Sequence, residues 1–282
     1  MELYIVDGTY ELFRAHFGYP SRTSPTGQEV GALKGYINHL QSLQKKYSYL
    51  AVCFDSTVES FRNDLYVDYK SSKGIEVEVL NQFSLTEEVT KLLGIQLIAT
   101  TEFEADDAIA SICENFKNSK KIKIVIGSLD KDLMQCVDDE KIVMYSTRYK
   151  KFTNADGVYE KFGIHPFQIP DFLALTGDSS DGIPGIKGVG QVTASKLLSE
   201  FENIENIIEN FDQIRSNYRG GEKLVDNISQ NIEDLKLFKT LTTLRKDVDI
   251  PKKIEMYELQ NINEKKLDEF SKLHNLNINI AK

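Results

Sequence analysis

The sequence predicts an α/β layer fold, with a mainly parallel sheet flanked by helices and a helical module after it. Short apolar runs of strand length alternate with helix-length segments from Met1 to about Phe162. Two of these runs end in an aspartate, and helical segments dominate after about Pro166. In open sheets of this class, ligands bind beyond the carboxyl ends of the strands, so the aspartates mark the expected site.

Five apolar runs are the expected strands. Leu3–Val6 is followed by Asp7, and Leu50–Phe54 is followed by Asp55. Continuous apolar runs are typical of parallel strands that are buried on both faces. The other expected strands are Ile95–Ala99, Ile122–Ile126 and Lys141–Tyr145, and the expected helices between strands include Gly31–Lys45 and Ala105–Phe116.

The second part of the chain is expected to be helical, so we divide the chain into residues 1–162 and residues 163–282. A Gly/Pro-rich loop, Asp181–Gly190, separates the first helices of the second part. Residues 64–86 match neither neighbouring pattern and are expected to form an exposed excursion of loop and short helix. Long excursions in compact domains are often functional. The expected helices are Phe167–Leu175, Gln191–Phe201 and Asn231–Leu244.

Composition limits the classes of function. The 282 residues include three cysteines, none in a Cys-x-x-Cys pair, which argues against structural zinc and against a disulfide framework. No stretch approaches the roughly 18 to 20 apolar residues of a membrane span, and we expect a soluble cytoplasmic protein without membrane contact. The net charge of −9 opposes nucleic-acid binding as a sum, but charge placement matters more.

Nine acidic residues end expected strands or begin expected helices. Together they would repel each other and raise their pKa values unless cations neutralised them. Oxygen ligands without His or Cys favour Mg²⁺ or Mn²⁺, and two such ions can activate water for attack on a phosphodiester. A single aspartate after a strand is as often a helix cap, whereas the joint pattern is specific. Without the nine negative charges of these residues, the formal net charge of the chain changes from −9 to 0, so the rest of the surface is balanced rather than acidic. The nine are Asp7, Asp55, Glu104, Asp106, Asp107, Asp130, Asp132, Asp178 and Asp181.

These residues lie in motifs that resemble the 5′ nuclease family, which includes the 5′–3′ exonuclease domain of bacterial DNA polymerase I and the flap endonucleases. The resemblance covers nearly the whole chain and implies a PIN-like sheet domain in a stand-alone nuclease. It also implies a helix–three-turn–helix at about residues 171–200 that often holds K⁺. The motifs are VDGTYELFRAH, AVCFDS, FRNDLYVDYKSS, FEADDAIA, GSLDKDLMQCV, IPDFLALTGDSSDGIPGIKGVGQVTASKLL and LTTLRKDVDI.

The resemblance further implies two adjacent metal clusters and an active enzyme, because every expected acidic position is present. We expect Asp7, Asp55 and Asp130 to take part directly in catalysis. Arg62 and Lys70 either steady the scissile phosphate or are solvated surface charges. One cluster would contain Asp7, Asp55, Glu104, Asp106 and Asp107, and the other would contain Asp130, Asp132, Asp178 and Asp181.

The excursion and the Gly/Pro loop supply the expected DNA contacts. Glycines let the backbone approach a phosphate closely, and a helix N-terminus offers free N–H groups. Tyr69 either stacks on a base or lies in the core, and Arg14 either binds phosphate or pairs with a carboxylate. Gly74–Val77 stands where relatives often have a proline-rich stretch, so the excursion should differ in shape. The expected contacts are Arg14, Tyr69, Lys73, Gly185, Lys187, Gly188, Gly190, Thr193 and Lys196.

These observations predict a Mg²⁺-dependent 5′–3′ exonuclease or flap endonuclease that acts on DNA with a 5′ flap or a single-strand/duplex junction. Primer removal and repair are the expected setting, with a DNA polymerase as partner and the protein as a monomer. Two alternatives stay open. A PIN-like ribonuclease usually lacks both the excursion and the Gly/Pro module, and a catalytically silent junction-binding protein would have lost acidic residues.

Overall fold

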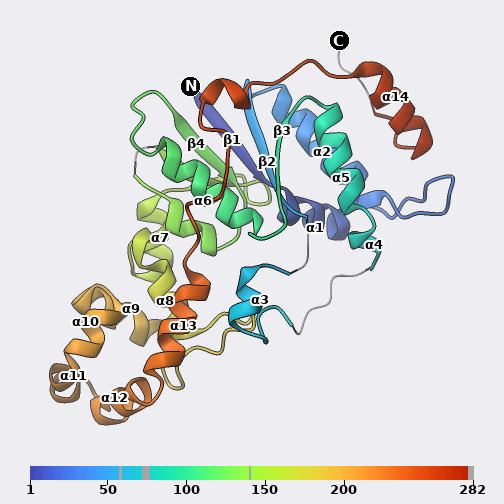
Figure 1. Ribbon diagram of the computed structural model, residues 1–282. Helices are drawn as coiled ribbons and strands as arrows, with labels where there is room; N and C mark the ends of the chain where they lie inside the picture. The colour runs from blue at the N-terminus through green and yellow to red at the C-terminus, as the bar shows by residue number, and fades with distance from the viewer. Residues whose placement is uncertain (57–58, 72–76, 140, 279–282) are drawn as a thin grey trace.

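The computed structural model describes residues 1–56, 59–71, 77–139 and 141–278 (Figure 1). In this part of the chain six strands form one sheet, in the order β3-β2-β1-β4-β5-β6. The first five strands are parallel to their neighbours, and β6 pairs antiparallel with β5. The predicted α/β fold is confirmed. The strands are β1 (Glu2–Asp7), β2 (Tyr49–Asp55), β3 (Gln96–Thr100), β4 (Lys123–Gly127), β5 (Ile142–Ser146) and β6 (Lys151–Thr153).

The five parallel strands coincide with the predicted apolar runs to within about one residue. The central strands β1, β2 and β4 are buried on both faces, as continuous apolar runs predict. Strand β6 was not predicted, since three residues without full burial leave no apolar run to recognise. Along β1, Leu3 and Ile5 point into one core, whereas Tyr4 and Val6 point into the other. This alternation gives three layers, with helices on each side of the sheet.

One face of the sheet is covered by α1, α2, α5 and α14, and the other face is covered by α6. Figure 1 shows the helical module extending away from the α6 side. The helices of the sheet region are α1 (Gly8–Gly18), α2 (Gly31–Gln44), α3 (Phe61–Leu65), α4 (Val77–Leu80), α5 (Phe83–Leu92), α6 (Ala105–Phe116), the 3₁₀ helix η1 (Asp132–Cys136) and α7 (Ala155–Phe162).

The helical module shares a continuous apolar core with the α6 face of the sheet. Its helices α8, α9 and α13 match the predicted helical segments closely. The division at residues 162 and 163 stays a prediction. The module contains η2 (Pro166–Gln168), α8 (Ile169–Thr176), α9 (Gln191–Phe201), α10 (Ile204–Glu209), α11 (Phe211–Asn217), α12 (Gly221–Ser229) and α13 (Ile232–Thr242).

After α13 the chain returns to the sheet. The 3₁₀ helix η3 (Ile254–Tyr257) contacts β2, and α14 (Glu264–Leu273) packs on α5. Between them, the N–H of Leu259 donates to Ser48 O and the N–H of Gln260 donates to Gly94 O. The segment therefore contributes to both faces: Ile254 and Tyr257 of η3 lie in the core on the α6 side, and α14 closes the opposite face.

The excursion and the Gly/Pro loop touch through backbone atoms. Gly182 has φ +74°, and a Cβ at this position would lie 2.5 Å from Asp68 O. The N–H of Lys70 donates to Asp181 O at 2.9 Å. This contact places the excursion beside the loop that carries Asp178 and Asp181. Within the described ranges, no helix combines the length and apolarity that crossing a membrane requires.

Candidate active site

The first group of carboxylates gathers where the strand order reverses, between β1 and β4. Asp7 ends β1, Asp55 ends β2, and Asp106 lies in the first turn of α6. Because β1, β2, β3 and β4 are parallel, their carboxyl ends meet at one edge of the sheet. Glu104 and Asp130, which follow β3 and β4, reach the same edge.

Asp7 is both the N-cap of α1 and a member of this group, so the two interpretations of a strand-end aspartate are compatible. Asp7 accepts hydrogen bonds from the Tyr10 N–H at 2.9 Å and from Ser128 Oγ at 2.8 Å. Asp55 accepts a hydrogen bond from the Ala105 N–H at 2.6 Å. These bonds fix the orientation of the two carboxylates before any ligand arrives.

A second group contains Asp132, Asp178 and Asp181, each of which offers an oxygen within 4.8 Å of the others. Asp132 lies in η1, while Asp178 and Asp181 lie in the loop after α8. The Asp132 N–H donates to Asp130 Oδ1 at 2.9 Å. Asp130 therefore stands between the two groups.

Burial and mutual repulsion raise the pKa of most of these carboxyl groups. Burial, then Asp130 and Asp55, raise the pKa of Asp7 to about 7, against the hydrogen bonds from Tyr10 and Ser128. Burial and Asp178 raise the pKa of Asp181 to about 6, although Lys70 opposes them. Burial, together with Asp130, holds the pKa values of Asp106 and Asp132 well above their usual range.

Two carboxylates differ because each has a lysine beside it. The Lys70 ammonium lies 2.9 Å from Glu104 Oε2, and the Lys131 ammonium lies 2.7 Å from Asp178 Oδ1. Burial raises the pKa of both groups and is the largest single effect. Lys70, with Arg62 and Ser60, still lowers the pKa of Glu104, and Lys131, with Ser180, lowers that of Asp178. Each group of carboxylates thus has one member that is paired with a lysine ammonium at hydrogen-bond distance.

We expect the metal-free protein to lose stability as the pH rises from about 4 to about 7. Over this range the unfolded chain loses the Asp7 proton while the folded protein keeps it, so rising pH favours unfolding. A pKa raised from 3.8 to about 7 corresponds to about 4 kcal/mol. Glu104 and Asp178, whose pKa values are lowered from 4.5 and 3.8, act in the opposite direction, but their contribution is complete above those ordinary values and does not change between pH 5 and pH 8.

Thermal unfolding in a chelator at pH 5 and pH 8 measures this loss. We expect a lower Tm at pH 8 than at pH 5, and a smaller difference between the two Tm values when Mg²⁺ is in excess. The Tm of Asp7→Asn should depend less on pH. Equal Tm values at the two pH values in the chelator would show that repulsion among the carboxylates is already relieved without a cation.

The donor set fits divalent metal ions. All candidate ligands in the two groups are carboxylate oxygens, which hard cations such as Mg²⁺ and Mn²⁺ prefer. Asp132 Oδ1 is buried and accepts no hydrogen bond from the described residues. A buried carboxylate oxygen without a partner is costly unless a cation neutralises it. The second group therefore fits a metal ion on its own geometry.

Arg62 and Asp107 are not placed as the sequence suggested. Arg62 is 1% exposed and donates two hydrogen bonds to Asp107, at 2.7 and 2.8 Å. Asp107 is fully buried and also accepts from the N–H groups of Glu104 and Arg245. With both oxygens engaged, Asp107 has no free position for a metal, and Arg62 is too deeply buried to reach a phosphate.

The structure also decides between the two interpretations of Tyr69 and between the two interpretations of Arg14. Tyr69 is 2% exposed, and its hydroxyl donates to Glu104 at 3.1 Å and approaches Asp181 at 3.3 Å. It supports the carboxylates and cannot stack on a base. Arg14 pairs with Glu11 on the same helix, which favours the carboxylate-pairing interpretation. Lys73, another expected DNA contact, lies outside the described residues.

The expected DNA contacts of the module lie at the start of α9. Gly188, Gly190 and Lys187 are exposed, and Gly188 has φ +86°, a left-handed conformation that favours glycine. Thr193 is partly exposed in the first turn, and the Lys196 ammonium lies 4.1 Å from the Tyr218 ring centroid.

Gly185 has a different role from the other glycines of this loop. A Cβ at this position would lie 2.2 Å from Gly177 N, so the residue is needed for packing of the loop on the end of α8. Its expected contact with DNA has no specific support in this geometry.

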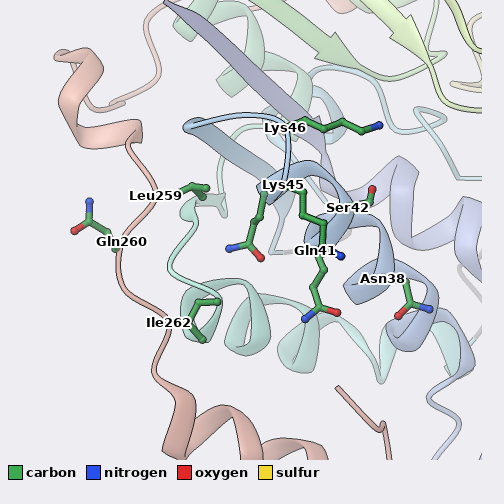
Figure 2. Close-up of a pocket in the computed structure, with 9 residues that line it drawn as sticks. Asn38, Gln41, Ser42, Lys45, Lys46, Leu259, Gln260 and Ile262 are labelled. Carbon is green, nitrogen blue, oxygen red and sulfur yellow. The ribbon is translucent and has the colours of Figure 1, made fainter. Parts of the chain in front are cut away.

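A groove of about 640 Å³ lies away from the carboxylates, between α2 and the returning C-terminal segment (Figure 2). Figure 2 shows Gln41, Lys45 and Lys46 on one side and Leu259 and Ile262 on the other. Lys46 precedes β2 by only a few residues, so the groove is at the amino ends of the strands. It takes no part in chemistry at the carboxyl edge.

Sequence reasoning missed Lys131, Ser128 and Ser180, which position the carboxylates. The Ser180 N–H donates to Asp178 Oδ1 at 2.9 Å, and Ser180 Oγ donates to the same oxygen. The run Asp130-Lys131-Asp132 could have drawn attention to Lys131. Nothing in the spacing could have shown which carboxylate this lysine contacts.

Comparison with known proteins agrees with this geometry. Residues 2–163 match the family model described as the 5′-3′ exonuclease N-terminal resolvase-like domain. Residues 164–265 match the model described as the 5′-3′ exonuclease C-terminal SAM fold.

Individual relatives cover most of the chain. A 5′-3′ exonuclease of Aquifex aeolicus is 37% identical over 251 residues, 88% of this chain and 83% of that protein. DNA polymerase I of Caldicellulosiruptor bescii is 33% identical over 95% of this chain, which spans only 32% of the polymerase. The phage T5 D15 flap endonuclease, crystallised with DNA and metal ions, shares the fold, with a TM-score of 0.71 and 23% identity over 96% of this chain and 97% of that chain. Since the two family models together match most of its length, the chain belongs to the 5′-3′ exonuclease family.

Proposed function

We propose that this protein is a metal-dependent 5′ nuclease that hydrolyses DNA phosphodiesters near single-strand/duplex junctions. The observation that carries the proposal is the pair of adjacent carboxylate groups at the switch point of the sheet. Asp178 and Asp181 belong to the loop that leads into α9, and Lys70 of the excursion contacts that loop through Asp181 O. Family membership and the T5 flap endonuclease complex with DNA and metal ions support it.

Eight carboxylates are proposed to hold two divalent ions, Mg²⁺ or Mn²⁺. When bound, such ions would neutralise the carboxylates and supply Lewis-acid activation of a water for in-line attack on phosphorus. Asp107 is left out because its oxygens are engaged by Arg62 and by two backbone N–H groups. The proposed ligands are Asp7, Asp55, Glu104, Asp106, Asp130, Asp132, Asp178 and Asp181.

Lys70 is proposed to orient the scissile phosphate. Its side chain is 40% exposed, and its ammonium lies between Glu104 at 2.9 Å and Asp181 at 4.0 Å. Its backbone has φ 53°, a left-handed conformation that a lysine rarely adopts. Strained residues of this kind are concentrated at functional sites, and the hydrogen bond from Lys70 N–H to Asp181 O holds this one in place.

The module is proposed to bind the duplex through its backbone phosphates. Gly188, Gly190 and the N-terminus of α9 offer a sequence-independent phosphate contact, with Lys187 and Lys196 adding positive charge. A K⁺ ion at this turn is part of the proposal. The proposal also includes action as a monomer inside the cell, with DNA replication and repair as the setting. A DNA polymerase is the proposed partner, as the polymerase relatives suggest.

Cleavage of a 5′-labelled flap DNA tests this proposal. A blunt duplex and an RNA single strand serve as comparison substrates, each with Mg²⁺, with Mn²⁺ and with EDTA. We expect cutting near the flap junction that requires the metal. Flap binding without cutting under every metal condition would identify a junction-binding protein, and preferential cutting of the RNA strand would identify a ribonuclease.

A further inference from the structure

A lysine side chain lies inside the second carboxylate group. The Lys131 ammonium is 2.7 Å from Asp178 Oδ1 and 3.5 Å from Ser180 Oγ. The Asp178 side chain is 2% exposed, whereas the Lys131 side chain is 32% exposed. The ammonium thus reaches from a solvent-accessible position onto a buried carboxylate.

The same carboxylate belongs to the set that fits a metal. Oxygens of Asp132, Asp178 and Asp181 lie within 4.8 Å of one another, and Asp132 Oδ1 has no hydrogen-bond partner among the described residues. Any cation held by this set lies within a few ångströms of the Lys131 ammonium. Two positive charges at such a distance repel strongly in a partly buried site. The ammonium and the metal ion therefore compete for the negative charge of Asp178.

We infer that Lys131 is an internal competitor for the second metal ion and that it is released when a DNA phosphate becomes available as its partner. This inference rests on the proposed function of the site. An ammonium on a four-carbon stem can transfer from a carboxylate to a nearby phosphate without backbone movement. Metal binding at the second group is then coupled to DNA binding, and the coupling is reciprocal.

Lys70 does not fit the same role. Its backbone is held by Asp181, and its ammonium pairs with Glu104, which lies on the α6 side of the site. Lys131 pairs directly with a member of the second group. Lys70 also lies 4.0 Å from Asp181, but its closest partner is Glu104, whereas the closest partner of Lys131 is Asp178 of the second group. Release of Lys131 would therefore change the charge of the second group more directly.

Counting bound Mn²⁺ by electron paramagnetic resonance, with isothermal titration calorimetry, tests the inference without measuring activity. We expect Lys131→Met to bind the weaker Mn²⁺ ion at least tenfold more tightly than the natural protein. Lys131→Gln should behave in the same way, and Lys131→Arg, which keeps the charge, should remain close to the natural protein.

Lys161→Met is the matched control, since Lys161 is an exposed lysine near the site whose ammonium lies over the Phe162 ring, 4.8 Å from its centroid. We expect less than a threefold change. A second experiment adds a nicked duplex with a 5′-phosphate, in which phosphorothioate linkages next to the nick keep the charge but slow cutting during the titration. It should tighten the weaker Mn²⁺ site of the natural protein but have little further effect on Lys131→Met.

Failure of the inference and failure of the proposed function give different results in these experiments. If the natural protein binds no Mn²⁺, the proposed function fails. If it binds two ions and both neutral variants leave the weaker site unchanged or weaken it, Lys131 is only a structural partner of Asp178 and the inference is overturned. Thermal unfolding of each variant establishes that it is folded.

Discussion

Replacing Asp106 by asparagine is expected to reduce DNA cleavage by at least about 10³-fold while raising the thermal stability of the metal-free protein. Burial and the charges of Asp130 and Asp7 hold the pKa of Asp106 well above its usual range. The neutral amide removes this repulsion but also removes a ligand oxygen. Without metal, we expect a gain of roughly 1–2 kcal/mol in the free energy of unfolding.

Asp156→Asn is the matched control, because Asp156 also lies in the first turn of a helix, α7, but is exposed. It reports the loss of a favourable helix-dipole interaction alone, which is about 0.3–1 kcal/mol. We expect slightly lower stability and full cleavage for this variant. Flap cleavage assays and thermal unfolding in a chelator give the two readouts. An Asp106→Asn protein that is less stable in the chelator and still cuts DNA would contradict the assignment of Asp106 to the metal site.

The carboxylates at strand ends could be predicted because one physical rule governs them. Parallel buried strands are recognisable as apolar runs, and their carboxyl ends meet at one edge. Asp7 and Asp55 follow such runs directly, so their approach to each other required no further information. A helix cap was the alternative for each single aspartate, and the structure shows that Asp7 fills both roles. The same reasoning could not foresee that Asp55 is held by the N–H of Ala105, which is distant in the sequence.

Burial of charged side chains could not be predicted in the same way. Arg62 and Asp107 are ordinary charged residues in the sequence, and only the packing of α3, α6 and the end of α13 hides them from water. Tyr69 was ambiguous for the same reason. The return of residues 254–278 to the sheet was also invisible, because it depends on backbone contacts with Ser48 and Gly94 that are distant in the sequence.

Arg62→Ala is expected to lower the free energy of unfolding by about 3–5 kcal/mol, the usual cost of removing one partner from a buried ion pair. The guanidinium joins three segments. It forms a bidentate pair with Asp107 on α6, and its Nε donates to Leu241 O near the end of α13. Its own backbone belongs to α3, at the root of the excursion. Removal leaves the Asp107 charge buried with only backbone N–H groups as partners.

The size of the change in the free energy of unfolding distinguishes the buried Arg62–Asp107 ion pair from an ion pair on the surface. Arg215 is the matched control, since it pairs with Asp212, Glu222 and Asp226 on the surface of the module. Exposed pairs of this kind contribute about 0–1 kcal/mol, so Arg215→Ala should unfold at nearly the natural denaturant concentration. Arg62→Lys should recover only part of the loss, because an ammonium cannot form the bidentate pair.

Denaturant unfolding of Arg62→Ala, Arg62→Lys and Arg215→Ala measures how much the buried ion pair stabilises the fold. If Arg62→Ala is no less stable than Arg215→Ala, the buried pair only offsets its own desolvation. Arg62 would then be free to leave Asp107, and its original interpretation as a phosphate contact would regain support. If the loss is large and cleavage also falls at temperatures where the variant is folded, the cause is the position of α6. The Glu104 N–H donates a hydrogen bond to Asp107. The Arg62–Asp107 ion pair that stabilises the fold therefore also fixes Glu104, one of the proposed metal ligands.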